Sequence, residues 1–333
     1  MTTNGSGPLL EVDGLVVRYP VSRGFVGTVA RRPRAWVHAV SGVSFGLRRG
    51  EMLALVGESG SGKTTTAQSV LRLLDPDAGT VRFDGEDITA LGARGLRPLR
   101  RRMQIIYQDP YESLDPRFRV RATLEEPLAV HGIGSRSERR AEAERALELA
   151  GLTPAELYLD RFPHELSGGQ RQRVAIAASP VLHPDLLVAD EPVSMLDVSV
   201  RAGILAILDD LRRRGLAVLM ITHDLSTAAR YADRIAVMYL GRIVEEGPAG
   251  DVVHNPQHPY TRALLSVVPK RDPRQRSQPQ VLRGETPNPV HVPVGCRFHP
   301  RCPMAIEECK RVDPVLEPTA QTDSRHTAAC IRV

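Results

Sequence analysis

A glycine-rich octapeptide at residues 57–64, Gly-Glu-Ser-Gly-Ser-Gly-Lys-Thr, constrains the fold more than any other stretch of this chain. It fits G-x-x-x-x-G-K-[ST], a loop whose glycines let backbone N–H groups turn inward around phosphate oxygens. The apolar run 52–56 before it predicts a buried strand, and Thr64 onward predicts a helix whose N-terminal dipole attracts anions. These flanks disfavour an ordinary glycine-rich turn and predict a phosphate-binding loop (P-loop).

Lysine 63 strengthens this interpretation. Lys63 is expected to place a compact charge on the β- and γ-phosphates, and the Thr64 hydroxyl is expected to complete a Mg²⁺ shell. The only other lysines are Lys270 and Lys310, in a chain that otherwise uses arginine for positive charge. Because a planar guanidinium does not fit a closed phosphate loop, the lysine is required there. The expected phosphate-binding residues are Gly57, Ser59, Gly60, Ser61, Gly62, Lys63, Thr64 and Thr65.

Composition limits what else the chain can be. Its 333 residues are enough for two domains with separate cores. The net charge of +5 is too modest to indicate nucleic acid, and no nucleic-acid partner is expected. The N-terminus lacks a charged segment followed by an apolar core, and no run of about 18 apolar residues occurs. We therefore expect a cytosolic chain that reaches a membrane only through a partner protein.

The N-terminal region is expected to supply a surface for the base of the nucleotide. Residues 9–19 and 37–47 predict two strands, and the Arg-, Gly- and Pro-rich residues 20–36 predict an exposed loop between them. Tyr19 is placed to stack on adenine, and Trp36 is a rival. A surface aromatic packed under the loop is an equal alternative to either assignment.

Beyond the P-loop helix, residues 80–83 and 86–88 predict a hairpin that turns at Asp84-Gly85. Residues 103–108 predict a buried strand that ends in Gln108. A glutamine at a strand end can join a Mg²⁺ shell or bind the attacking water, although such a residue is more often a simple hydrogen-bonding group.

A second anion site is predicted far along the chain. Residues 123–150 predict a largely helical segment that stops at Gly151. The pentapeptide 166–170 then reads Leu-Ser-Gly-Gly-Gln, in which Ser167 can cap the next helix while two glycines leave its N-terminus bare. A glycine-rich helix start without function is an even alternative. The candidate contacts are Ser167, Gly168, Gly169 and Gln170.

Two more apolar runs end in polar side chains. Residues 186–191 finish in Asp190 and Glu191, two carboxylates that are costly to bury unless a cation or water occupies the site. Asp190 suits the Mg²⁺ shell, and Glu191 suits deprotonating the attacking water. Residues 216–222 close on His223, which can bind the γ-phosphate and the water, although a lone histidine at a strand end is more often structural.

In this order the motifs resemble those of the ATP-binding cassette (ABC) ATPases. The resemblance covers roughly residues 9–250 and rests on six motifs in family order: 57–64, Gln108, 166–170, Asp190-Glu191, the loop 194–197 and His223. Six motifs in one order are far more specific than any one of them. It implies an α/β fold: a P-loop nucleotide-binding domain with a mixed sheet core and a helical subdomain. It also implies that Asp197, in the loop 194–197, lines the path between two nucleotide sites.

The resemblance implies partners as well. Two cassettes would close head to tail on two ATP molecules, each held by Lys63-type contacts from one chain and Ser167-type contacts from the other. The second cassette would be a related ATPase subunit or another copy of this chain. Closure and reopening would drive two membrane permease subunits, with the segment after Gln108 facing the coupling helix. The chain would then lie at the cytoplasmic face of the membrane, held there through the permeases.

The C-terminal third narrows the family. Residues 255–265 and 295–303 resemble the extension found in oligopeptide/dipeptide importer ATPases, and residues 107–111 with the long loop 20–36 resemble their F-type subunit. An extracytoplasmic solute-binding protein would belong to the same system. Related importers carry nickel or oligosaccharides, so these cargoes are alternatives, as is a soluble ABC ATPase without a transport role. The pentapeptide 166–170 and His223 argue against a metabolic P-loop kinase.

Four cysteines, Cys296, Cys302, Cys309 and Cys330, are all the cysteines of the chain. In a reducing compartment such clustering favours metal ligation over disulfides. Four thiolates can hold a [4Fe–4S] cluster or a tetrahedral Zn²⁺, and the resemblance favours the cluster, since some relatives carry one. Empty thiols remain an alternative. His299 and His326 could substitute as zinc ligands, but surface or capping roles are expected for them.

The predicted organisation is a nucleotide-binding domain at residues 1–250, with its helical subdomain at about residues 109–180, and a small irregular extension with four cysteines at 251–333. The chain departs from the ABC pattern in two places. Pro180 should end or kink the helix after the pentapeptide. Met195 replaces a residue that is more often small, and nothing in the sequence explains it.

Overall fold

The computed structural model describes residues 7–21, 35–109, 114–194, 196–268, 280, 282, 284–319 and 325–333. The chain forms two compact units that interleave along the sequence. We call residues 1–7, 47–52 and 90–221 the helical unit, and residues 8–46, 53–89 and 222–333 the P-loop unit. The expected boundary at residue 250 therefore falls inside the P-loop unit. Met195 and most of the loop 20–36 lie outside the described residues.

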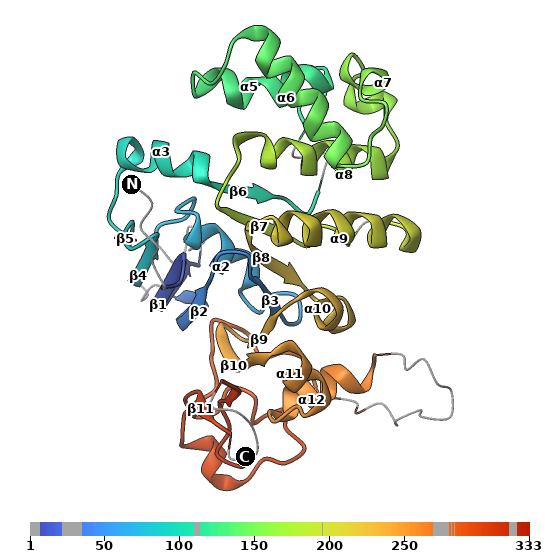
Figure 1. The fold of residues 1–333 in the computed structure, drawn as a ribbon. Coiled ribbons are helices and arrows are strands. Elements are labelled where there is room, and N and C mark those ends of the chain that lie inside the picture. The colour runs from blue at the N-terminus through green and yellow to red at the C-terminus, as the bar shows by residue number, and fades with distance from the viewer. Residues whose placement is uncertain are drawn as a thin grey trace, which may run out of the picture. The chain divides into compact units, whose positions relative to one another are not determined.

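The helical unit combines parallel strands with a group of helices (Figure 1). Strand β7 pairs in parallel with β6 and with β8, so that Ile106 lies opposite Ala189 and Asp190 lies opposite Ile221. The strands are β6 (Met103–Ile106), β7 (Leu186–Asp190) and β8 (Ala217–Thr222). The helices are α3 (Ala93–Arg102), α5 (Val120–Val130), α6 (Arg136–Leu149), α7 (Glu156–Leu159), α8 (Gly168–Ala178) and α9 (Val198–Arg213).

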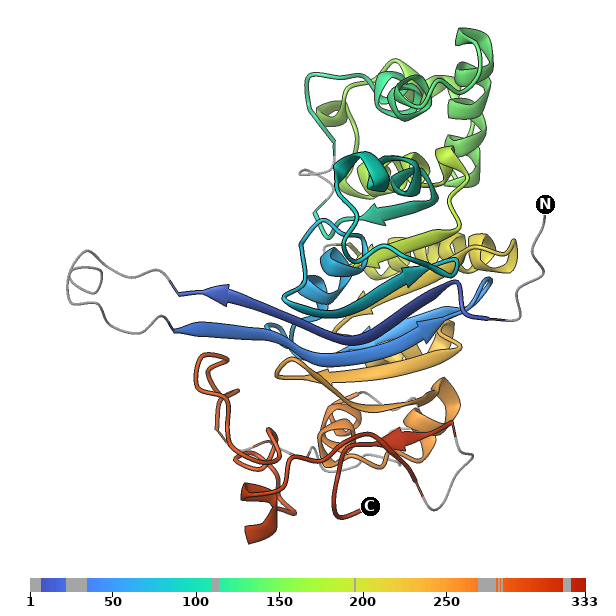
Figure 2. The same cartoon turned by 90° about the vertical axis from the view of Figure 1, so that its left-hand side faces the viewer.

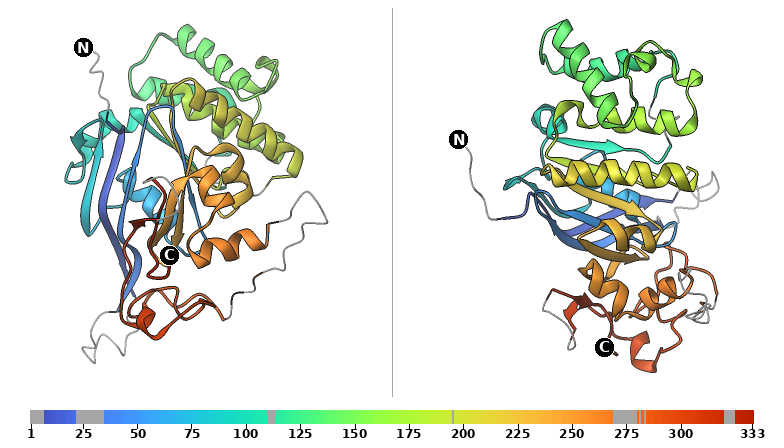
Figure 3. Two further views of the ribbon diagram at one scale, coloured as in Figure 1. Left: turned by 60° about the horizontal axis from the view of Figure 1, so that its bottom comes forward. Right: turned by 45° about the vertical axis from the view of Figure 1, so that its right-hand side comes forward.

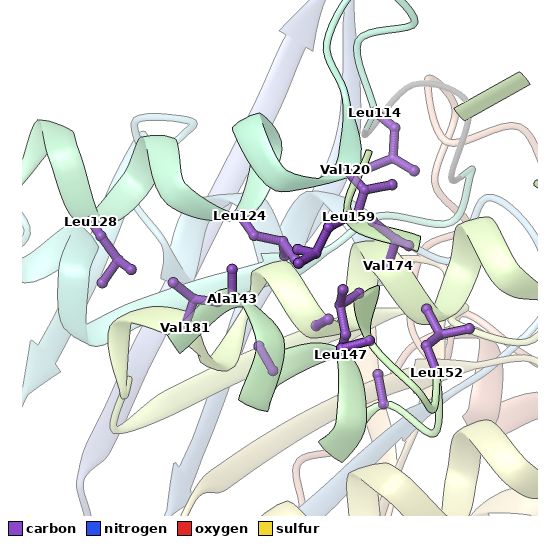
Figure 4. Packing of buried hydrophobic residues seen from close by; sticks show 14 of the residues in the cluster. Leu114, Val120, Leu124, Leu128, Ala143, Leu147, Leu152, Leu159, Val174 and Val181 are labelled. Atoms are coloured by element: carbon purple, nitrogen blue, oxygen red, sulfur yellow. The ribbon is translucent and has the colours of Figure 1, made fainter. Parts of the chain in front are cut away.

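Helices α5, α6 and α8 share one apolar core. Leu124, Leu147 and Val174 are all fully buried in it (Figure 4). Ala143 and Ala146 of α6 are buried in the same core, and their small side chains leave room for close packing of the neighbouring helices. Burying each leucine or valine side chain contributes about 1.5–3 kcal/mol. This cluster spans residues 114–182 and gives the helices a core of their own.

The expected largely helical segment at 123–150, with its stop at Gly151, is confirmed. The structure has two helices, α5 and α6, because Gly132 and Gly134 both adopt positive φ and break the chain between them. Ser135 then caps α6 through a capping box with Glu138. The predicted strand 103–108 is shorter in the structure, since β6 ends at Ile106. The predicted effect of Pro180 is confirmed: α8 ends at Ala178, and a 3₁₀ turn covers residues 180–182.

The P-loop unit contains a four-stranded sheet ordered β2-β1-β4-β5. Its two long strands run side by side in Figure 2, and the predicted hairpin is formed by β4 and β5. Asp84 and Gly85 both have positive φ at its turn, as a two-residue hairpin requires. The strands are β1 (Leu10–Pro20), β2 (Trp36–Leu47), β4 (Ala78–Phe83) and β5 (Glu86–Asp87).

A mixed set of strands carries the P-loop itself. Strand β3 pairs in parallel with β9, whereas β9 with β10, β10 with β12 and β12 with β11 pair antiparallel. The strands are β3 (Met52–Val56), β9 (Arg234–Tyr239), β10 (Arg242–Pro248), β11 (Glu317–Pro318) and β12 (Thr327–Ala328). All five residues of β3 are buried, as its continuous apolar run predicts. The expected α/β fold with mixed strand pairing is confirmed.

The helices of the P-loop unit are α2 (Lys63–Val70), α10 (Leu225–Tyr231), α11 (Ala249–His254) and α12 (Pro259–Ser266). We call residues 251–333 the extension. Figure 3 shows its red C-terminal part beside the orange helices α11 and α12. Pairing of β12 with β10 joins the end of the chain to the strands next to the P-loop.

Candidate nucleotide-binding site

The P-loop joins β3 to α2, and two of its glycines are fixed by close backbone contacts. A Cβ atom at Gly57 would lie 2.2 Å from the carbonyl oxygen of Met238, and one at Gly62 would lie 2.2 Å from that of Ala39. Gly62 also has a φ of +104° at the N-cap of α2. The loop therefore approaches the neighbouring strands too closely for any residue but glycine at either position.

Lys63 is buried within this loop, with an exposed fraction of only 5%. Its Nζ donates hydrogen bonds to the carbonyl oxygens of Gly57 (2.8 Å) and Glu58 (2.9 Å). These carbonyls fix the ammonium inside the loop. The Ser61 hydroxyl is also buried, and it has no hydrogen-bond partner among the described residues. Since a buried hydroxyl normally has a partner, the loop fits an anion that supplies acceptor oxygens.

Thr64 and Thr65 begin the first turn of α2. Thr64 is exposed, which suits a hydroxyl that is to reach a metal ion. The Tyr19 hydroxyl lies 3.5 Å from Thr65 Oγ1, and the side chain of Tyr19 is exposed. The rival Trp36 instead packs against Arg18, whose guanidinium carbon lies 5.5 Å from the centre of the indole ring. The structure thus brings Tyr19 to the helix that follows the P-loop.

The carboxylates predicted at a strand end lie in the helical unit. Asp190 ends β7 and is 5% exposed, and Glu191 follows it with a φ of +45°. The backbone N–H of Glu191 donates to Ile221 of β8 at 2.9 Å. Gln108 Nε2 lies 3.4 Å from Glu191 Oε2. Two of the predicted catalytic residues, 83 positions apart, are therefore brought together at the ends of neighbouring parallel strands.

The pentapeptide 166–170 has the predicted helix-capping geometry. Ser167 is the N-cap of α8: its Oγ accepts from Gln170 N (3.3 Å), and Gln170 Oε1 accepts from Ser167 N (3.0 Å). A Cβ atom at Gly168 would meet nothing within 4 Å, and Ser167 is exposed. The N-terminus of α8 thus presents bare backbone in a fixed orientation. Asp197, exposed, stands at the N-cap of α9 without a side-chain cap.

His223 follows β8 and is exposed, in the P-loop unit. Its neighbour Asp224 has a role that the sequence did not reveal, as the N-cap of α10. Its carboxylate accepts hydrogen bonds from Ser226 N (2.9 Å) and Thr227 Oγ1 (2.6 Å). Burial alone would raise the pKa of Asp224, but these hydrogen bonds outweigh burial and hold it below its usual value. Asp224 thereby fixes the chain next to His223.

The four cysteines line one pocket of the P-loop unit and are free thiols. Burial is the largest effect on Cys296 and raises the pKa of its thiol to about 11, and the nearby Cys309 and Cys330 add to the rise. The pKa values of Cys302 and Cys330 are raised for the same reason. Within the described ranges, no group of three or more His, Cys, Asp or Glu has the arrangement of a metal site. The four donors therefore share a pocket without forming a ready-made ligand set.

The surface or capping role expected for His326 is wrong. His326 is fully buried, and its Nε2 lies 2.8 Å from Oε1 of Glu245, which is also fully buried. The same carboxylate accepts hydrogen bonds from the backbone N–H groups of Gln257 (2.7 Å) and His258 (2.9 Å). Glu245 therefore holds two separate parts of the extension on β10. His299 contacts the carbonyl oxygen of Cys296 through Nδ1 at 2.9 Å.

Comparison with protein families defines the class of protein. Residues 40–194 match the family described as ABC transporter, and residues 244–309 match the oligopeptide/dipeptide transporter C-terminal region. The chain belongs to the ABC transporter family, as one of its ATPases, which confirms the resemblance seen in the sequence. No helix in the described part of the chain is both long enough and apolar enough to cross a membrane.

Individual relatives match almost the whole chain. The putative peptide import ATP-binding protein of Brucella ovis is 48% identical over 98% of this chain and 98% of its own length. The dipeptide transport ATP-binding protein DppF of Haemophilus influenzae is 44% identical over 98% and 97%, respectively. These matches include the extension.

Solved structures share the cassette. A bacterial ABC transporter cassette solved as a dimer has a TM-score of 0.64 and 28% identity, covering 72% of this chain and 98% of its own. The protein cbiO1 of Clostridium perfringens, part of an ABC transporter complex, has a TM-score of 0.63 and 29% identity over 75% and 92%, respectively.

Proposed function

We propose that this chain is the ATP-hydrolysing subunit of an importer for dipeptides or oligopeptides. The observation that carries the proposal is the similarity to a peptide import ATP-binding protein over 98% of the chain. The glutathione import ATP-binding protein GsiA of Salmonella paratyphi A is 48% identical over 85% of this chain and 45% of its own length, and it supports a peptide-like cargo.

In this proposal the P-loop residues bind the triphosphate. Lys63 carries the charge that faces the β- and γ-phosphates, and Tyr19 stacks on the base. Thr64, Gln108 and Asp190 would hold Mg²⁺, and the ion would neutralise charge that develops on the phosphate oxygens. Glu191 takes the proton of the attacking water, and His223 binds the γ-phosphate. The fixed position of Lys63 and the 3.4 Å approach of Gln108 to Glu191 support these roles.

The proposed assembly is a pair of cassettes. Ser167, Gly168, Gly169 and Gln170 of one chain would contact the ATP bound by the other, and Asp197 would line the path between the sites. A related cassette is known as a dimer with ADP and phosphate, which supports this arrangement. The partner would be a sister ATPase or a second copy. Two permease subunits would anchor the pair at the cytoplasmic face, and a solute-binding protein would deliver the cargo.

We also propose that residues 1–250 form the cassette and 251–333 its extension, with the helical subdomain at about residues 109–180. Separate family matches at 40–194 and 244–309 support the first division. The core shared by α5, α6 and α8, which begins at Leu114 and ends at Leu182, supports the second.

A titration of the full-length chain with MgATP tests the nucleotide assignment. Lys63→Ala should weaken binding at least about tenfold, because it removes a charged hydrogen-bond donor to phosphate. Lys310→Ala is the matched control, since Lys310 is exposed and forms an exposed ion pair with Glu307 (2.8 Å). An unchanged affinity in Lys63→Ala would contradict the assignment. Co-purification with two permease subunits, followed by ATP-dependent peptide uptake in vesicles, tests the transport role.

The four cysteines form one proposed thiol site, for which a [4Fe–4S] cluster is favoured over Zn²⁺. Their common pocket supports the proposal. A bound metal would have to draw the thiols together and displace their protons, because the described residues show no ready-made ligand set and the pKa values are raised. Iron, sulfide and zinc analysis of anaerobically purified protein decides among cluster, zinc and empty thiols. If the purified protein contains no iron, no sulfide and no zinc, the proposed metal site is contradicted.

A further inference from the structure

Three side chains of the extension converge on one residue of the P-loop, Glu58. The Tyr260 hydroxyl accepts a hydrogen bond from Glu58 N at 3.0 Å. The Thr286 hydroxyl donates to Glu58 Oε2 at 2.8 Å. Arg301 forms a two-pronged ion pair with the carboxylate, from Nη1 to Oε2 at 2.8 Å and from Nη2 to Oε1 at 3.3 Å. Three residues that lie 202, 228 and 243 positions from Glu58 along the chain therefore fix this one residue of the P-loop.

The ion pair has the features of a fixed contact. The Arg301 side chain is only 9% exposed, and its guanidinium carbon lies 5.9 Å from the ring centre of Tyr239. Tyr239, Tyr260 and Phe298 pack against one another with ring centres 4.7 to 5.4 Å apart, so the wall behind the guanidinium is rigid. A planar guanidinium held in this way orients a carboxylate through two hydrogen bonds at once.

Glu58 remains charged in this setting. Burial alone would raise its pKa, but the hydrogen bonds from Arg301 and Thr286 outweigh burial and keep the pKa below its usual value. The carboxylate is therefore ionised at neutral pH, and the pair with Arg301 persists under the conditions in which ATP binds. Arg301 also offsets one negative charge that would otherwise lie in the loop meant for a triphosphate.

The held residue is directly connected to Lys63. Lys63 Nζ donates to the carbonyl oxygens of Gly57 and Glu58, the two residues at the start of the loop. Glu58 is thus fixed at its N–H, at its carboxylate and at its carbonyl. Because that carbonyl holds the ammonium, any displacement of Glu58 moves the charge that is to meet the phosphates.

We propose that the extension positions the P-loop for nucleotide binding, with Arg301, Thr286 and Tyr260 acting as positioning residues through Glu58. This inference rests on the proposed ATP binding by the same loop. A purely structural contact would stabilise the extension without changing the affinity for nucleotide. A positioning contact changes the affinity for nucleotide, because without it part of the binding energy is used to order the P-loop.

The test is MgATP binding by the full-length chain, with the free energy of unfolding measured in parallel. Arg301→Ala and Glu58→Gln should each raise the Kd for MgATP by about fivefold to tenfold, the range of ordinary coupling between sites. The double variant should bind MgATP no more weakly than the weaker of the two single variants, because both substitutions remove the same contact. In steady state the KM for ATP should rise while kcat at saturation is kept. Glu307→Gln is the matched control, since it breaks an exposed ion pair of the extension, that of Glu307 with Lys310 (2.8 Å).

Two milder variants keep the test decisive if Arg301→Ala fails to fold. Tyr260→Phe removes only the acceptor of Glu58 N, and Arg301→Lys keeps the charge but loses the two-pronged geometry. Both should weaken MgATP binding by a smaller factor. Lys63→Ala is measured beside them. If Lys63→Ala loses ATP while the Glu58 and Arg301 variants bind normally, positioning is overturned and the proposed function stands. If Lys63→Ala also binds normally, both are overturned.

Discussion

The side-chain nitrogen of Gln108 lies 3.4 Å from Oε2 of Glu191, although the two residues are 83 positions apart. The contact follows from the parallel pairing of β6 with β7, which places Ile106 beside Ala189 and brings the next residues of both strands to one edge. Glu191 has a φ of +45°, a conformation that costs a non-glycine residue of order 1–3 kcal/mol. The fold thus holds this carboxylate in a strained position beside an amide, as expected where orientation serves chemistry.

Glu191→Gln should abolish ATP turnover while MgATP binding survives. The amide keeps the shape of the side chain but cannot accept the proton of the attacking water, a loss of about 100-fold or more. ATP that binds without being hydrolysed should also trap the closed pair of cassettes, which size-exclusion chromatography detects. Glu144→Gln is a suitable control, because Glu144 pairs with Arg140 on the helix surface. Near-normal phosphate release by Glu191→Gln would remove Glu191 from its proposed role.

Ser167→Ala should reduce the ATPase rate of the assembled pair by about tenfold or more. The Ser167 Oγ accepts from Gln170 N, and its own proton can be donated to a phosphate oxygen, a bond worth about 1.5–3 kcal/mol. The free energy of unfolding of the variant should also fall by about 1 kcal/mol, because the N-cap of α8 is lost.

Ser135→Ala separates these two effects. Ser135 forms the same capping box on α6, with Glu138 N donating to its Oγ and its own N–H donating to Glu138. Its removal should cost similar stability and leave hydrolysis unchanged. Equal ATPase rates in the two serine variants would mean that Ser167 is only a helix cap.

Gly57→Ala should impair MgATP binding at least about tenfold. The new methyl group would lie 2.2 Å from the carbonyl oxygen of Met238, so the loop or β9 must move, at a cost of about 1–3 kcal/mol. Gly46→Ala is the control, because its Cβ would meet its nearest neighbour, in Pro8, at an ordinary 3.5 Å. If Gly57→Ala binds MgATP normally, the loop does not need the close approach seen in the structure.

Features set by local sequence were predictable. The P-loop glycines, the Ser167 capping box and the end of α8 before Pro180 each depend on residues within a few positions. Gln108 and Glu191 were both expected near the attacking water, but the pairing of β6 with β7 that brings them together was not assigned from the sequence. The break between α5 and α6 was also missed, because the Ala-, Leu- and Glu-rich composition outweighed two glycines, Gly132 and Gly134.

Long-range contacts could not be predicted in the same way. Arg301 meets Glu58 across 243 positions, and His326 meets Glu245 across 81. The sequence around a single charged residue in a loop does not indicate which residue it will contact, and an isolated histidine is usually predicted to lie on the surface. The peptide 255–265 resembled a family segment, but the reason for its sequence, a carboxylate that binds the N–H groups of Gln257 and His258, appears only in the fold.

His258 should make the protein less stable in mild acid. Burial lowers its pKa to about 4, with Glu245 opposing and Arg262 reinforcing the shift. Between about pH 6.5 and pH 4 the unfolded chain therefore binds more protons, so stability falls as pH falls through this window. Between pH 7 and pH 5 the contribution is about 2 kcal/mol. In urea unfolding, the free energy of unfolding of His258→Asn should fall less between pH 7 and pH 5 than that of the unchanged protein. Asparagine can still accept a hydrogen bond from Tyr260 N at the start of α12, but it does not titrate. An identical loss in both proteins would assign the acid sensitivity to other groups.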